Sequence, residues 1–147
     1  MRFHRTIGYI LSLTLVFCLQ VQAAAPEVKV FKTPTCGCCG KWVEHLKANG
    51  FTPVVTEVPS TAEYRRQYGV PEKLQSCHTA VVNGHPIEGH VPAEDIHRLL
   101  KTGKKGTGLA VPGMPMGSPG MEQGERHDAY SVVLFDPEGR TSVYQKY

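Results

Sequence analysis

The chain has no large excess of charge of either sign. It carries 16 Lys and Arg against 13 Asp and Glu, and without Arg2 and Arg5 the balance is 14 to 13. So small an excess gives no electrostatic attraction to nucleic acid or to an anionic membrane surface, and we expect neither as a partner. Beyond the N-terminal segment, no apolar run approaches the roughly 20 residues of a membrane-spanning helix. The chain also lacks internal repeats, so we predict a single globular domain.

The long apolar run of the chain stands at its N-terminus. Arg2 and Arg5 form a basic start, residues 7–21 are mostly apolar and uncharged, and Ala23–Ala25 supply small residues for cleavage. This order is typical of a secretory signal peptide, which we predict over residues 1–25. The mature chain, residues 26–147, is then exported, which in a Gram-negative bacterium means the periplasm. An uncleaved membrane anchor and a lipoprotein acylated at Cys18 remain open as alternatives.

The mature chain alternates strand-like and helix-like patterns. Runs of β-forming residues predict strands at residues 28–31, 51–58, 79–82 and 85–90. We predict three helices, which follow Gly40, Ser60 and Pro92. The signals are the helical spacing of apolar residues and the presence of residues that cap helices. The order β-α-β-α-β-β-α predicts an α/β fold of the thioredoxin-like type, which is a four-stranded mixed sheet with flanking helices.

The last third of the chain has a different composition. Residues 103–129 are rich in Gly and Pro and show no apolar period, so we predict an irregular loop there. Within residues 130–147, two alternating runs flank the turn sequence Asp136–Gly139, which predicts a C-terminal β-hairpin. We therefore expect residues 26–147 to form one thioredoxin-like metal-binding domain with this loop and hairpin appended.

Three cysteines crowd into four positions just before the first predicted helix. They are Cys36, Cys38 and Cys39. Disulfide frameworks usually spread their cysteines to staple distant loops, so the crowding indicates metal or redox chemistry. Redox exchange needs an attacking and a resolving thiol, which Cys36 and Cys39 supply, and Cys38 is then surplus. Three thiolates in one turn suit a soft metal ion, and a helix N-terminus favours thiolate over thiol.

Cys77 and His78 favour the metal interpretation. They precede the third predicted strand, where thioredoxin-like enzymes usually carry a cis-proline in a loop that faces the Cys-x-x-Cys turn. A thiol and an imidazole in place of that proline indicate a metal site beside the cysteine cluster. His90, near the end of the next strand, is a further candidate ligand. His85 lies five positions earlier and faces the opposite side of an ideal strand.

The methionines of the mature chain lie together in the predicted loop. They are Met114, Met116 and Met121, and none falls in the predicted core. Thioether sulfur is a soft donor that selects Cu(I), so we treat these residues as additional metal ligands. The alternative, that the loop only packs its methionines over the sheet, stays open.

Four motifs stand in order along the mature chain: TPTCGCC at 33–39, SCHT at 76–79, GHVP at 89–92 and VPGMPMGSPGME at 111–122. Together they resemble the CopG-like family of small exported metal-binding proteins with a thioredoxin-like fold, which occur with copper-resistance genes. The resemblance covers residues 28–147. It implies copper binding by several Cu(I) ions bridged by thiolates. The metal ligands it implies are Cys36, Cys38, Cys39, Cys77, His78 and His90.

Three functions are consistent with these features. The first is a periplasmic copper-binding protein for copper resistance, with copper ions and other periplasmic copper-handling proteins as partners. Whether such a site also interconverts Cu(I) and Cu(II), as a copper oxidoreductase would, stays open. The second is a thiol–disulfide oxidoreductase that uses Cys36 and Cys39. The third is a structural zinc site of three cysteines and His78, in which Cys38 has no role.

Overall fold

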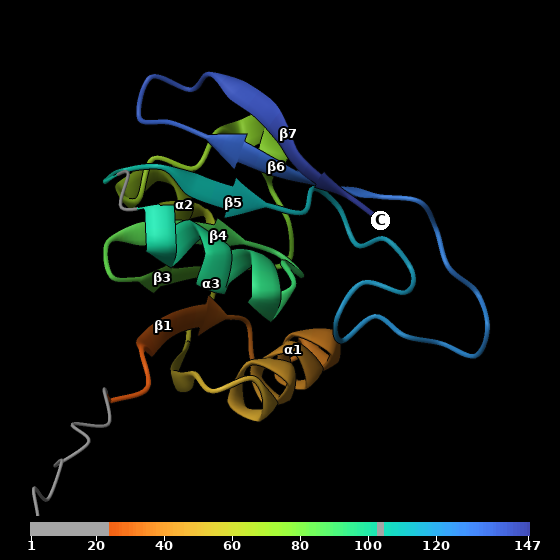
Figure 1. The fold of residues 1–147 in the computed structure, drawn as a ribbon. Helices are drawn as coiled ribbons and strands as arrows, with labels where there is room; N and C mark the ends of the chain where they lie inside the picture. Colours follow the sequence, from red (N-terminus) through yellow and green to blue (C-terminus); the bar gives the residue numbers. More distant parts are fainter. Residues whose placement is uncertain (1–23, 103–104) are drawn as a thin grey trace, which may run out of the picture.

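The computed structural model describes residues 24–102 and 105–147 (Figure 1). Of the predicted signal peptide, only Ala24 and Ala25 belong to the described residues, and Cys18 lies outside them. Among the described residues, no helix combines the length and the apolar character that a membrane crossing requires. The first strand begins at Glu27, two residues after the predicted cleavage region.

The described residues form seven strands and three α-helices. The strands are β1 (Glu27–Lys32), β2 (Thr52–Glu57), β3 (His78–Val82), β4 (His85–Glu88), β5 (Gly108–Ala110), β6 (Ser131–Phe135) and β7 (Thr141–Lys146). The helices are α1 (Gly37–Ala48), α2 (Ala62–Gln67) and α3 (Ala93–Thr102), and a short 3-10 turn covers Glu72–Leu74. All seven strands belong to one mixed sheet, in the order β2-β1-β3-β4-β5-β6-β7. The α/β fold class is thereby confirmed.

The prediction of a four-stranded sheet was wrong, because β5, β6 and β7 continue the sheet beyond β4. Strand β5 pairs parallel to β4, with Ile87 opposite Leu109, and the β6–β7 hairpin extends the sheet from β5. Strand β5 also interrupts residues 103–129, which were predicted as irregular throughout. Its three residues are too few to show a period in the sequence, and its pairing depends on contacts distant in the chain. The C-terminal hairpin itself is present as predicted.

The turn between β3 and β4 shows why these residues form a hairpin. Asn83 and Gly84 have φ angles of 49° and 81°, the left-handed pair that a two-residue type I′ turn needs. Asn and Gly are the residues that adopt this conformation at least cost. The turn directs β4 back along β3, so that Thr79 at the start of β3 lies opposite Glu88 at the end of β4.

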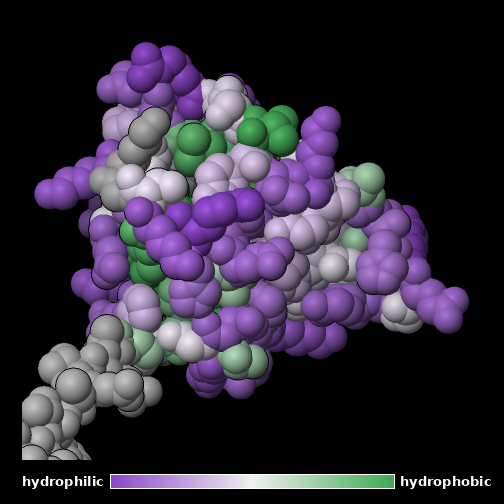
Figure 2. Space-filling view, in the orientation of Figure 1, coloured by the Kyte–Doolittle hydropathy of each residue, from purple (hydrophilic) through white to green (hydrophobic). Residues whose placement is uncertain are grey.

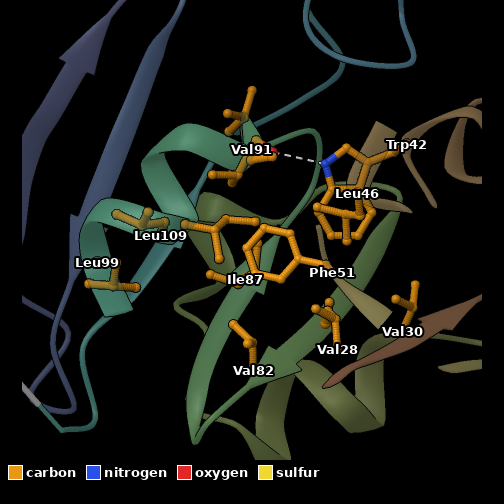
Figure 3. Packing of buried hydrophobic residues seen from close by; sticks show 14 of the residues in the cluster. Val28, Val30, Trp42, Leu46, Phe51, Val82, Ile87, Val91, Leu99 and Leu109 are labelled. Atoms are coloured by element: carbon orange, nitrogen blue, oxygen red, sulfur yellow. Dashed lines mark hydrogen bonds between the residues drawn. The ribbon is translucent and has the colours of Figure 1, made fainter. Parts of the chain in front are cut away.

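The core lies between the sheet and the helices and includes Trp42 and Leu46 of α1 (Figure 3). Val28 and Val30 from β1 pack with Trp42 and Leu46 from α1, and all four side chains are fully buried. The indole Nε1 of Trp42 donates a hydrogen bond of 2.9 Å to the carbonyl oxygen of Val91. This bond fixes α1 against the connection between β4 and α3, which carries His90.

The surface is polar over most of the face in Figure 2, with hydrophobic residues in small separate areas. The large hydrophobic side chains that are exposed include Val54 and Val55 on β2 and Val143 on β7. These strands are the two edges of the sheet. The long segment between β5 and β6 runs along one end of the sheet and comes close to α1 (Figure 1).

Candidate metal site

The first turn of α1 presents the clustered cysteines. Cys36 is the N-cap residue, and its side chain makes no capping hydrogen bond to the start of the helix. The first turn contains no acidic residue, and Cys38 and Cys39 lie within it. The unpaired N–H groups of a helix start carry partial positive charge, which stabilises thiolates there. The predicted position of the three cysteines, at the start of a helix, is therefore present in the structure.

Four sulfur atoms gather at this turn. The Sγ atoms of Cys36, Cys38, Cys39 and Cys77 all lie within 4.8 Å of one another. Cys36 and Cys39 are joined by a disulfide, whereas Cys38 and Cys77 are free. The Sγ atom of Cys38 lies 3.6 Å from that of Cys36. Reduction of the disulfide would leave four thiols at distances that a shared metal ion or cluster can span.

Cys77 also belongs to a second group of donors. Its Sγ atom lies 3.3 Å from Nδ1 of His78 and 3.1 Å from Nε2 of His90. Both imidazole side chains are fully buried, and their rings meet edge to face with centroids 5.1 Å apart. Trp42 covers His78, with ring centroids 4.3 Å apart. The Nε2 atom of His78 is buried and has no hydrogen-bond partner among the described residues. Cys77 therefore connects the cysteine cluster to a pair of buried histidines.

Burial sets the charge of this second group. Burial lowers the pKa of His78 to about 3, helped by the nearby His90, and burial also lowers the pKa of His90. Burial raises the pKa of the Cys77 thiol to about 12, and the charge on Cys38 adds to that effect. At neutral pH, the metal-free protein thus holds two neutral imidazoles with free lone pairs and one protonated thiol. A cation that binds here would displace the thiol proton.

A buried carboxylate supports the segment that carries Cys77 and His78. Glu88 is fully buried and accepts hydrogen bonds of 2.7 Å from the backbone N–H of Ser76 and from Oγ1 of Thr79. Arg65 lies 3.8 Å from the same carboxylate, and burial raises the pKa of Glu88 to about 7. The two hydrogen bonds fall on either side of Cys77 and His78. Sequence reasoning missed Glu88, although an acid in a strand beside two candidate ligands is a visible signal.

The structure brings the six predicted Cys and His ligands into these two overlapping groups. His85 does not join them, because its Nδ1 atom contacts the carbonyl oxygen of Thr107 at 2.8 Å. The methionines lie on the segment between β5 and β6, where Met114 is 53% exposed while Met116 and Met121 are partly buried. Two glycines of this segment contact the site. The Ser76 hydroxyl donates a hydrogen bond to the carbonyl of Gly113, just before Met114, and Gly120, just before Met121, packs against the backbone of Cys38.

Comparison with known proteins gives a consistent picture. A family described as "Protein of unknown function, DUF411" matches residues 74–121, which contain Cys77, His78, His90 and the methionines. No curated protein sequence matches the chain. Two solved structures, titled "Copper resistance protein copG", Form 2 and Form 1, are both 44% identical to it, with TM-scores of 0.78 and 0.77. The matches cover 83% and 82% of this chain and 98% and 96% of those chains. The chain belongs to the CopG family of copper resistance proteins, as its four sequence motifs predicted.

Proposed function

We propose that this protein binds copper as its cargo in the periplasm and so contributes to copper resistance. The ligands in this proposal are the four cysteines of the cluster together with His78 and His90. The observation that carries it is the position of Cys77, whose sulfur lies in contact range of both donor groups. Because a thiolate can bridge two metal ions, a residue shared in this way favours a site that holds more than one ion.

The donor atoms favour Cu(I) over harder ions. Thiolates are soft ligands that select Cu(I), and the groups closest to the cluster offer sulfur and neutral nitrogen rather than carboxylate oxygen. Imidazole also suits Cu(II), so this pair of donor types would accommodate both oxidation states, and their interconversion would require an external one-electron donor or acceptor. The thioethers of Met114, Met116 and Met121 would act as additional soft ligands. A single tetrahedral zinc site would leave donors unused.

The N-terminal sequence supports the cellular location in this proposal. The basic start, the apolar run and Ala23–Ala25 are the features of a cleaved signal peptide, so the mature domain would comprise residues 26–147. In that compartment, other periplasmic copper-handling proteins would deliver or receive the ion. The compartment is oxidising, so the cluster would depend on bound metal or on a reductant to stay out of the disulfide form.

The disulfide between Cys36 and Cys39 favours a second candidate function, thiol–disulfide exchange. It stands at a helix N-terminus, where an attacking thiolate is stabilised. Catalysed reduction of a disulfide-bonded substrate such as insulin, unchanged in C38S and in the presence of a copper chelator, would support this function over copper binding.

The copper proposal is tested by measuring how many Cu(I) ions the mature chain binds under strictly anaerobic, reducing conditions. We expect more than one ion per wild-type chain and fewer in Cys38→Ser, because Cys38 is one of the four clustered donors. The matched control is His127→Ala, which removes an exposed imidazole that lies outside both donor groups. Equal copper binding by wild type and Cys38→Ser would contradict the proposed ligand set.

A further inference from the structure

The segment between β5 and β6 contacts the site through its backbone. The carbonyl oxygen of Pro119 lies 2.8 Å from Nδ1 of His90. His90 itself is fully buried, and its other ring nitrogen lies 3.1 Å from the sulfur of Cys77. The imidazole of His90 thus contacts Pro119 of the loop on one side and Cys77 on the other, and Cys77 belongs to both donor groups.

This contact determines which nitrogen of His90 carries hydrogen. A carbonyl oxygen can only accept a hydrogen bond, so Nδ1 must be the donor and Nε2 must hold the free lone pair of the neutral ring. The lone pair then faces Cys77, where it accepts from the thiol in the metal-free protein and is available to a metal ion. A metal-ligating histidine is commonly oriented in this way, by a hydrogen bond from its second nitrogen.

Gly120 holds Pro119 in place. It has a φ of +87°, and a Cβ atom built on it would lie 2.7 Å from the backbone nitrogen of Trp42 and 2.9 Å from the carbonyl oxygen of Cys38. A side chain would therefore collide with the backbone of α1, and only glycine lets the loop lie this close. The turn that contains Pro119 and Gly120 is itself closed by a 2.8 Å hydrogen bond from the N–H of Met121 to the Ser118 carbonyl. The loop is thus seated against the turn that carries the clustered cysteines.

We propose that Pro119 and Gly120 form a positioning strap, which holds the Nδ1–H tautomer of His90 and so directs Nε2 toward the metal. This inference depends on the proposed copper function in one respect only, which is that the ion bound by His90 is copper. The strap itself is a property of the metal-free protein. It gives the Gly- and Pro-rich loop a role at the site that does not depend on its methionine sulfurs.

The test begins with the reduced, metal-free mature chain, whose histidine tautomers are read from long-range proton–nitrogen NMR spectra of the imidazole rings. The wild-type spectrum is expected to show His90 protonated at Nδ1. The variant Gly120→Ala should lose this preference, because its Cβ displaces the strap from α1. Gly124→Ala is the matched control, since Gly124 has a φ of +59° in the same loop and open space around its Cβ position. Pro119→Ala keeps the accepting carbonyl and should keep the wild-type tautomer.

The second readout is Cu(I) affinity, measured by competition with a colorimetric Cu(I) chelator. Loss of a group that orients a metal ligand typically costs 10- to 100-fold in affinity, and we expect a loss of about that size in Gly120→Ala alone. An Nε2–H tautomer in the wild-type protein would overturn the proposal without any variant. So would a Gly120→Ala protein that matches Gly124→Ala in both tautomer and affinity. If wild type binds no Cu(I), the proposed function fails, while the tautomer result still decides on the strap.

Discussion

The sulfur of Cys77 lies 3.1 Å from Nε2 of His90, although the two residues are separated by 13 positions in the chain. Cys77 precedes β3, and His90 follows β4, so the β3–β4 hairpin brings the two residues together at its open end. The same sulfur belongs to the cluster of four cysteines. A hairpin and a helix N-terminus thereby assemble one continuous set of sulfur and imidazole donors.

Replacement of Cys77 should damage copper binding more than replacement of any other single cysteine. In Cys77→Ser, both donor groups lose their common member, whereas Cys38→Ser affects the cysteine cluster alone. We expect Cys77→Ser to lower Cu(I) affinity at least 10-fold beyond the effect of Cys38→Ser, as measured by chelator competition. Equal losses in the two variants would show that Cys77 does not connect the groups.

Copper binding should depend on the oxidation state of Cys36 and Cys39. The disulfide takes up two electrons and two protons when a phosphine reductant converts it to two thiols, so two sulfur ligands become available. We expect the reduced protein to bind more Cu(I) per chain than the oxidised protein, both loaded without air after removal of the reductant. The variant Cys36→Ser cannot form this disulfide, and its copper content should not change with the same treatment. An oxidised wild-type protein that binds as much copper as the reduced one would contradict the prediction.

Titration of Glu88 should lower the stability of the metal-free protein as pH rises, in opposition to the buried imidazoles of His78 and His90, whose lowered pKa values favour the fold as pH rises. Burial raises the pKa of this carboxyl from 4.5 to about 7, so the folded protein keeps a proton that the unfolded chain releases. A group with a raised folded pKa stabilises the fold below its unfolded pKa, and that stabilisation is lost between pH 4.5 and about 7. At 1.36 kcal/mol per pKa unit, the loss amounts to about 3 kcal/mol. Glu88→Gln keeps the histidine contributions, so urea unfolding at pH 4.5 and 7.5 should show that the stability of wild type relative to Glu88→Gln falls between the two pH values. An unchanged difference would contradict this account.

Because β5 packs tightly into the sheet, adding one methyl group at Gly108 should lower the free energy of unfolding substantially. A Cβ atom on Gly108 would lie 2.5 Å from the carbonyl oxygen of Pro86 and would collide with the ring of Phe135. We expect Gly108→Ala to lower the free energy of unfolding by about 3 kcal/mol, the upper range for overpacking. The comparison variant is Gly40→Ala, because Gly40 lies inside α1 with open space around its Cβ position. It should raise stability by about 0.5–1 kcal/mol. An unaltered unfolding midpoint in Gly108→Ala would mean that β5 does not pack in this position.

Local sequence patterns predicted the fold from β1 to α3, because each element in this part of the chain has a strong sequence signal. The alternation of apolar residues, the Asn83-Gly84 turn and the acidic start of α3 each specify an element within a short window. Strand β5 could not be predicted in that way, since three residues carry no period and its partners are distant in the chain. The size of the sheet therefore follows from long-range pairing that no local pattern records.

The candidate site was also predictable only in part. Cysteine and histidine are the residue types that most often bind soft or borderline metal ions, so Cys77, His78 and His90 could be selected from the sequence before their proximity was known. Glu88 escaped notice because an acid in a strand is ordinarily a solvent-facing residue. The carbonyl of Pro119 has no side-chain signature at all, and its contact with His90 becomes visible only in the folded chain.

The most direct test of the account is X-ray absorption spectroscopy at the copper edge on the mature chain, loaded with Cu(I) without air. The predicted result is Cu(I) surrounded mainly by sulfur with a nitrogen contribution, at more than one ion per chain. The nitrogen contribution should fall in His90→Ala, and the sulfur-bound copper should be lost when Cys36, Cys38 and Cys39 are replaced together. Copper bound chiefly by oxygen and nitrogen, or no stable copper at all, would contradict the proposal that this cysteine cluster is a copper site.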